Sequence, residues 1–439
     1  MGQRKLKLIN KLKNREEHEE QVRTLPKLPE HIFIEILSKI PPKILRDTFM
    51  LVCKSWYRLI RSFEFIEKNA VYHKPGIIVN FLVAPNYYTE FPYCKAKFLQ
   101  IDEKEFDIKV TNLGKARRMG YIRSSCNGLI LVTEPRPRTK SSALCVKNML
   151  TGSVLTDLPS CPSGCLHSYD ECGAGLGFNP LTKQYKVVHI YSDGYGFEIF
   201  TIGSDKEWRK LPTPFEESYE RPYDMDFRWE EPVLINGHVF HWSFESDEYI
   251  ISMDLRDEKI RKTNLPVYMS KIKKKDYELV EMGGKLSFVY RVSSSRIDVW
   301  VLTDFGKQVW SKQHRIIAES TNFLTLGSSS AMVEEEGNGD GGEISENREE
   351  EKKKDKLPDF LKLFVVATLR NGEVIVFRRF RNPGNNDPIY LYDMKTGEMR
   401  KFKMKMKDGT GFIPHRSSLV SWTTESEMDL SANISNISL

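Results

Sequence analysis

The sequence predicts a small three-helix module followed by an all-β propeller of about six blades, and three observations support this. Between residues 25 and 69, apolar side chains recur at helical spacing. Beyond about residue 75, short strand-like runs alternate with Gly, Asn, Asp and Pro, and long helical patterns are absent. A hairpin-like pattern recurs there about every 50 residues, and such a period with several strands per unit indicates a propeller.

The helical module is predicted from its apolar stripes and its prolines. The first helix follows Pro29 and ends at Pro41-Pro42, because proline suits a helix start and stops a helix that precedes it. The second helix is expected over Lys43 to Met50. A third helix carries one apolar face made of Val52, Trp56, Leu59, Ile60 and Phe63.

The blades are predicted from a weak internal repeat. The segments VKNMLTGSVLTDLP, IFTIGSDKEWRKLP and SMDLRDEKIRKTNLP end at Pro159, Pro212 and Pro266, and two later copies keep the strand, turn and return strand. Each copy is read as a hairpin, with a turn such as Thr396-Gly397. The predicted units span 75–112, 120–160, 172–212, 232–266, 278–317 and 361–404. The segment SSLVSW (417–422) is the candidate for a strand that closes the ring.

Composition sets the domain boundaries. Residues 1–24 are expected to form a charged flexible N-terminus, residues 75–425 the propeller, and residues 426–439 a flexible tail. The charge-dense stretch at 334–357 has almost no apolar residues and is predicted to be a disordered insert between blades.

Charge and hydropathy exclude several function classes. The net charge of +6, from 66 basic and 60 acidic residues, is too mild for a dedicated nucleic-acid binder. Neither a secretory signal nor an apolar stretch long enough to span a membrane is found. We therefore expect a protein of the nucleus and cytoplasm, with no nucleic-acid or membrane partner and with its seven cysteines reduced.

Motifs for catalysis or for cofactors are weak. The segment CPSGCLHSYDEC offers Cys161, Cys165, His167 and Cys172 as possible zinc ligands, but their spacing is irregular and no second CxxC pair exists. A loop with reduced thiols is the preferred interpretation. The segment GAGLGF precedes a turn and a strand, whereas a phosphate-binding loop needs a helix after it. The sequence thus predicts no catalytic residue, no metal and no cofactor.

A polar, aromatic segment is a candidate binding surface. The stretch SYERPYDMDFRWEE lies between two predicted blades and mixes Tyr, Arg and Trp, the residue types most common at protein-binding hot spots. Its candidate target-contacting residues are Tyr219, Arg221, Tyr223, Arg228 and Trp229. A packed crossover segment is the alternative interpretation.

The helical module resembles an F-box. That family's pattern is met by Leu28-Pro29, Ile32, Glu35-Ile36-Leu37, Ile40-Pro41, Val52-Cys53-Lys54-Ser55-Trp56 and Leu59-Ile60. The strand-rich part resembles the F-box-associated domain of plant F-box proteins, which is related in layout to kelch propellers. The resemblance rests on the segments SSCNGLILV, GLGFNPLTKQYKVVHI and VLINGHVFHW, which come in that family's order.

The resemblance implies a substrate receptor of an SCF-type cullin–RING ubiquitin ligase. Its F-box would dock on a Skp-type adaptor and, through it, on cullin and RING proteins, while the propeller would hold an unknown target protein. Such a receptor is not an enzyme. The adaptor-binding residues that the resemblance implies are Leu28, Pro29, Ile32, Ile36, Leu37, Ile40, Pro41, Val52, Cys53, Lys54, Trp56, Leu59 and Ile60.

Two other functions stay open from the sequence. The propeller could act as an enzyme or small-molecule receptor, because propeller channels host both. The chain could also be a scaffold that binds the adaptor without assembling a ligase. Capture of the adaptor separates the receptor from the first alternative, and a ubiquitination assay separates it from the second.

Overall fold

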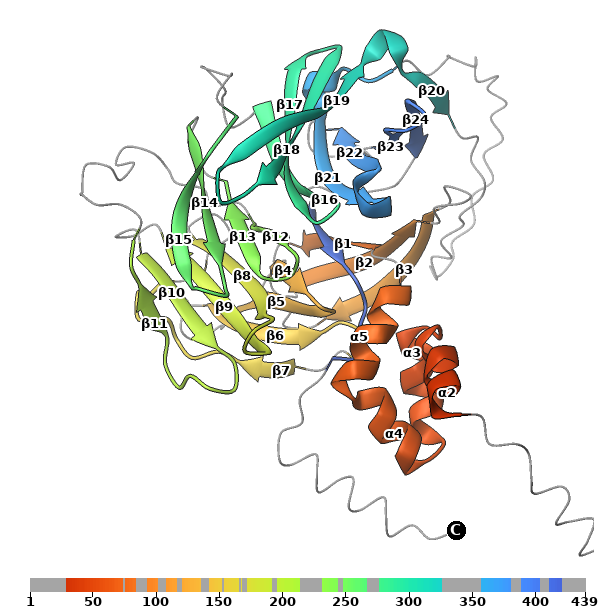
Figure 1. Cartoon of the computed structure of the whole chain (residues 1–439), viewed down its shortest axis with the longest axis vertical. Coiled ribbons are helices and arrows are strands. Elements are labelled where there is room, and N and C mark those ends of the chain that lie inside the picture. The colour runs from red at the N-terminus through yellow and green to blue at the C-terminus, as the bar shows by residue number, and fades with distance from the viewer. Residues whose placement is uncertain are drawn as a thin grey trace, which may run out of the picture. The chain divides into compact units, whose positions relative to one another are not determined.

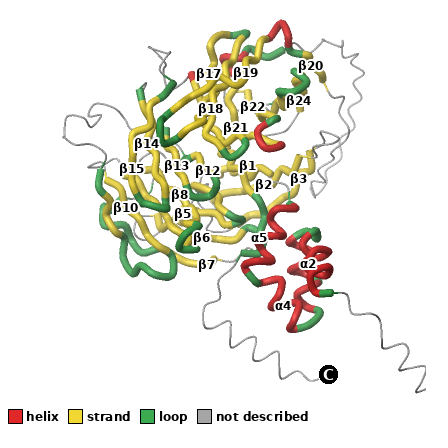
Figure 2. The backbone as a smooth tube through the Cα atoms, in the orientation of Figure 1, coloured by secondary structure: helices red, strands yellow, loops and turns green. Residues whose placement is uncertain are grey.

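The computed structural model divides into two compact units, Met1–His73 and Lys74–Leu439. The structure describes residues 29–73, 76–83, 93–101, 108–116, 121–135, 142–151, 154–165, 167, 172–191, 196–213, 231–243, 248–266, 276–325, 357–379, 388–402 and 410–420. Figure 2 shows the α-helices gathered in the first unit and the strands in the second. No helix in the described ranges is long and apolar enough to cross a membrane.

The first unit is built from short helices, as predicted. They are α2 (Glu30–Ser38), α3 (Pro42–Asp47), the 3-10 helix η1 (Phe49–Leu51), α4 (Lys54–Arg61) and α5 (Phe63–Tyr72). The predicted third helix divides at Ser62, whose extended backbone ends α4. The Ser62 hydroxyl then accepts a hydrogen bond from the backbone N–H of Phe65 and caps α5.

The core of this unit is small. Leu37, Leu45, Ile60 and Phe65 are buried within it. The Asn69 side-chain amide on α5 donates to the backbone oxygens of Ser38 (2.8 Å) and Ile40 (3.0 Å). Because those carbonyls lie at the end of α2, these bonds satisfy orphan helix-end acceptors and join α5 to α2.

The second unit is a six-bladed β-propeller, which confirms the predicted fold class (Figure 1). Each sheet is one blade, and its strands are named in the order in which neighbouring strands pair. The first holds β25 (Thr410–His415), β1 (Gly76–Val83), β2 (Tyr93–Ile101) and β3 (Ile108–Ala116). The second holds β4 (Ile122–Cys126), β5 (Leu129–Pro135), β6 (Ser142–Asn148) and β7 (Val154–Asp157). The third holds β8 (Cys172–Asn179), β9 (Gln184–Tyr191), β10 (Gly196–Thr201) and β11 (Arg209–Leu211).

The remaining three sheets complete the propeller. The fourth holds β12 (Val233–Ile235), β13 (Val239–Trp242), β14 (Tyr249–Asp254) and β15 (Lys259–Asn264). The fifth holds β16 (Tyr277–Met282), β17 (Lys285–Ser293), β18 (Arg296–Asp304) and β19 (Val309–Ile317). The sixth holds β21 (Leu363–Leu369), β22 (Val374–Arg379), β23 (Ile389–Asp393), β24 (Glu398–Phe402) and an added edge strand, β20 (Asn322–Thr325). Short 3-10 helices lie at η4 (Ala318–Ser320), η5 (Phe360–Lys362) and η6 (Arg370–Gly372).

The ring closes through β25. This strand pairs antiparallel with β1 and lies at the inner edge of the first sheet, so the last strand of the chain completes the first blade. The predicted closing strand at 417–422 was placed too late: residues 416–420 have no strand assignment, and residues 421–422 lie outside the described ranges. A Pro within the β25 sequence, TGFIPH, is tolerated because β25 is an edge strand.

The propeller core lies between neighbouring sheets. One cluster joins Val188 and Phe197 of the third sheet to Phe240, Trp242 and Met253 of the fourth. Each blade buries an apolar face that would otherwise be exposed to water, which is the physical reason for stacking blades in a ring.

Asparagine side chains stabilise strand-end turns in two of the sheets. Asn179 ends β8, and its side-chain oxygen accepts from the backbone N–H groups of Leu181 (2.9 Å) and Thr182 (3.3 Å). Its amide donates to the backbone oxygen of Leu255 in the fourth sheet (2.6 Å). Asn148 makes equivalent bonds in the second sheet, with its amide donating to Ser418 and Val420.

Two predicted flexible segments lie outside the described residues. These are the N-terminal 24 residues and the tail at 426–439. The insert at 334–357 is also outside them, except for Leu357, which packs against the core formed by the fifth and sixth sheets.

Candidate functional site

The helical unit exposes several apolar side chains at predicted adaptor positions. Ile32 and Ile36 on α2 are 39% and 49% exposed, and Val52, between η1 and α4, is 57% exposed. Leu51 (79%) and Ile44 (47%) are also exposed but were not among the predicted residues. The sequence could have indicated Ile44 and Leu51 only through their apolar character. In so short a segment, apolar character does not distinguish surface residues from core residues.

Trp56 is a packing residue as well as a candidate contact. Its ring lies 4.6 Å from the ring of Phe33 on α2 and 5.6 Å from that of Phe49, between ring centres, and it stacks almost parallel on Phe49. Trp56 is only half-buried by these contacts. It therefore holds α4 against α2 and η1 while leaving part of its surface exposed.

The structure places other predicted adaptor residues differently. Leu37 and Ile60 are buried at 2% and 0% exposure, so they belong to the core of this unit rather than to its surface. The spacing groups these side chains on common helix faces, and the innermost of them fill the small core. Pro29, Pro41, Cys53 and Lys54 are exposed, whereas Ile40 and Leu59 are half-buried. Leu28 lies outside the described residues.

A polar network orients α2. Glu35 pairs with Lys68 of α5 (2.5 Å) and accepts a hydrogen bond from the Tyr72 hydroxyl (2.5 Å). The hydrogen bond from Lys68, and then that from Tyr72, lowers the pKa of Glu35 to about 2. Ile32 and Ile36 of the same helix stay exposed beside this network.

The predicted target-contacting residues cannot be placed. Tyr219, Arg221, Tyr223, Arg228 and Trp229 all lie within 214–230, outside the described residues. They remain sequence predictions.

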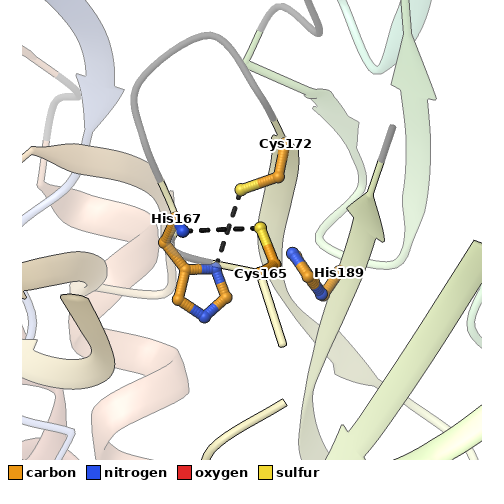
Figure 3. A group of neighbouring side chains, drawn as sticks. All are labelled: Cys165, His167, Cys172 and His189. Atoms are coloured by element: carbon orange, nitrogen blue, oxygen red, sulfur yellow. Dashed lines mark hydrogen bonds between the residues drawn. The ribbon is translucent and has the colours of Figure 1, made fainter. Parts of the chain in front are cut away.

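A second group of side chains comes together in the propeller. Cys165 and His167 lie in the connection between β7 and β8, Cys172 begins β8, and His189 lies on β9 (Figure 3). The ligating atoms of these four residues all lie within 4.8 Å of one another. The irregular cysteine spacing favours a plain loop, and it does not include His189, which a different strand supplies. A histidine inside the apolar run YKVVHIY was the signal available.

Family comparisons agree with both units. Residues 25–68 match the model of the F-box domain, and residues 92–340 match that of the F-box associated beta propeller domain. This chain belongs to the F-box associated β-propeller family. The F-box unit is thus the helical unit described above, and strands β21 to β25 continue the propeller beyond the matched range.

Curated relatives carry the F-box in their names. The chain is 24% identical over 412 residues to an F-box/kelch-repeat protein of Arabidopsis thaliana, covering 87% of this chain and 86% of the relative. It is 26% identical over 328 residues to an F-box protein of the same plant, covering 66% of this chain and 73% of that protein.

The chain has a weak likeness to solved structures. One is TolB from Acinetobacter baumannii, with a TM-score of 0.39 and 11% identity over 77% of this chain and 66% of that one. Another is a chain of a nidogen/laminin complex, with a TM-score of 0.41 and 9% identity over 78% of this chain and 99% of that one.

Proposed function

We propose that the chain is the substrate-recognition subunit of an SCF-type cullin–RING ubiquitin ligase in the nucleus and cytoplasm. The F-box unit docks on a Skp-type adaptor, and the propeller binds a target protein. F-box proteins are in general non-catalytic adaptors, and the role assigned here is of that kind. The receptor accelerates ubiquitin transfer by raising the effective concentration of the target lysine near the charged partner enzyme.

The observation that carries this proposal is the exposure of Ile32, Ile36 and Val52. A single exposed apolar side chain is ordinary on a protein surface. These three, however, occupy positions of the F-box pattern, and Ile44 and Leu51 add further apolar surface to the same small unit. A unit of this size cannot bury all its apolar groups, so a partner can cover the remainder.

The proposal predicts that Ile36→Asp combined with Val52→Asp strongly weakens adaptor binding. Both side chains are exposed, so the substitutions place charge on the surface without opening the core. Loss of one interface anchor costs at least about 2 kcal/mol, so binding should weaken about 30-fold or more. The measurement is the dissociation constant between the full chain and a purified Skp-type adaptor.

Val71→Asp is the matched control, because Val71 is 76% exposed on α5 of the same unit and is not a predicted adaptor residue. This variant should bind the adaptor as the wild-type chain does. Wild-type affinity in the Ile36/Val52 double variant, with an unchanged melting temperature, would overturn the proposed docking surface.

A further inference from the structure

The four clustered side chains in the third blade have the composition of a metal centre. Cys165, His167, Cys172 and His189 offer two thiols and two imidazoles, all with ligating atoms within 4.8 Å of one another. The Cys172 sulfur lies 3.6 Å from Nδ1 of His167. For a tetrahedral zinc ion with ordinary Zn–S and Zn–N bonds, neighbouring ligand atoms are about 3.4–3.8 Å apart, so the observed separations need only a small contraction.

His189 provides an independent indication of a ligand. Its side chain is fully buried, and its Nδ1 lies 3.2 Å from the carboxylate of Glu198, which is also fully buried. Its Nε2 is buried and has no hydrogen-bond partner. Buried polar atoms are almost always satisfied, so an unpartnered nitrogen next to thiols indicates a missing partner. Figure 3 shows this ring beside the sulfur of Cys165.

The outer nitrogen of each imidazole already has a partner. Nε2 of His167 lies 3.4 Å from the sulfur of Cys161, while its Nδ1 points to Cys172. Nδ1 of His189 meets Glu198, while its Nε2 is free. Metal-bound histidines typically use the second nitrogen in this way, and a carboxylate behind the ring fixes its orientation and tautomer. Glu198 is itself held by the backbone N–H (3.1 Å) and hydroxyl (3.3 Å) of Ser163.

Arg123 fixes the connection that supplies three of the four residues. Its buried guanidinium donates to the backbone oxygens of His167 (2.9 Å) and Cys172 (3.2 Å) and lies 3.8 Å from the Cys172 sulfur. These bonds hold both ends of the segment in place before any ion binds.

We propose that this cluster binds one zinc ion through Sγ of Cys165, Nδ1 of His167, Sγ of Cys172 and Nε2 of His189. Thiolate and imidazole ligands in tetrahedral number favour zinc over calcium or magnesium, which prefer oxygen. Two thiolates balance the charge of the ion, and four protein ligands leave no open position for catalysis. The site is therefore structural: it joins the connection after β7 to strands β8 and β9.

Zinc analysis of the full-length chain tests the proposal. The wild-type chain should contain about one zinc per molecule, whereas Cys165→Ala combined with Cys172→Ala should retain about tenfold less or lower. Cys145→Ala is the control for loss of a thiol, because Cys145 is a buried cysteine outside this cluster and should leave the zinc content unchanged.

A second measurement applies if the double variant fails to fold. Wild-type protein stripped with a chelator should melt at a lower temperature, and zinc, but not magnesium, should restore the original value. Cobalt added in place of zinc should give the visible bands of a tetrahedral site and a thiolate charge-transfer band. A wild-type chain that takes up no zinc, or that holds Cys165 and Cys172 in a disulfide, would overturn the proposal. An unchanged zinc content in the folded Cys165→Ala/Cys172→Ala variant would also overturn the proposal.

Discussion

His241 is a buried histidine in an uncharged setting. Its side chain lies on β13 and is 2% exposed, and Nδ1 lies 2.7 Å from the Ser252 hydroxyl, which in turn lies 2.7 Å from that of Thr263. The ring of Phe305 meets it edge-on. Burial lowers the pKa of His241 to about 3, because the charged imidazolium would lose its hydration without a compensating anion.

This shift predicts that acid weakens the propeller. Between pH 6.5 and about 3, the unfolded chain binds a proton on this imidazole that the folded chain does not bind. The contribution of His241 should therefore lower the free energy of unfolding by about 1.4 kcal/mol for each pH unit below 6.5. His415, whose pKa burial lowers to about 4, acts in the same direction.

Urea unfolding at pH 7, 6 and 5 measures the effect. His241→Asn keeps a polar side chain near Ser252 but cannot titrate. The slope of the unfolding free energy against pH should therefore decrease by the contribution of about one bound proton. An unchanged slope in this variant would show that His241 is protonated in the folded chain.

For single residues, the sequence could identify candidates for binding but not their exposure to solvent. Ile36 and Leu37 are adjacent and equally apolar, yet Ile36 is exposed and Leu37 is buried. Periodicity places both near one helix face, and only the position of α5 decides which of them it covers. His189 shows a second limit of prediction from sequence. It lies near Cys165 and Cys172 because β9 pairs with β8, and the spacing of residues along the chain does not predict that pairing.

The repeating strand-end turns show why the blade period could be predicted. An Asn or Asp at each of these positions accepts from the following backbone N–H groups, as Asn148, Asp254 and Asp393 do. This local hydrogen bonding leaves a mark in the sequence. The closing strand β25 leaves none, because its partner β1 lies at the other end of the chain.

Asn179→Asp should destabilise the propeller by about 1–3 kcal/mol. The carboxylate can still accept from the turn, but it cannot donate to the backbone oxygen of Leu255 and leaves that buried acceptor unpaired. Asp304→Asn is the control, since the Asp304 carboxylate accepts from the backbone N–H of Lys307 and the new amide oxygen can do the same. Urea midpoints that shift equally in the two variants would mean that the bond to the fourth sheet contributes nothing.

The two units divide the proposed work between them. The F-box unit has a core around Leu45, Ile60 and Phe65, and it exposes apolar residues at positions of the family pattern. The core clusters of the propeller draw on residues from Ile77 to Val420. Both fold classes followed from the sequence because each unit has its own period. The target-binding surface could not be predicted from the sequence, because residue types alone do not show which side chains lie close together in space.

The most direct test is the half-life of a protein that the propeller captures. Wild-type chain and the Ile36→Asp/Val52→Asp variant are expressed separately, their captured proteins are identified by mass spectrometry, and the half-life of a protein common to both is measured. We predict that both chains capture it, that the wild-type chain shortens its half-life, and that the variant leaves it unchanged or longer. If the variant shortens the half-life as much as the wild-type chain does, destruction does not depend on the F-box, and the receptor function proposed here is wrong.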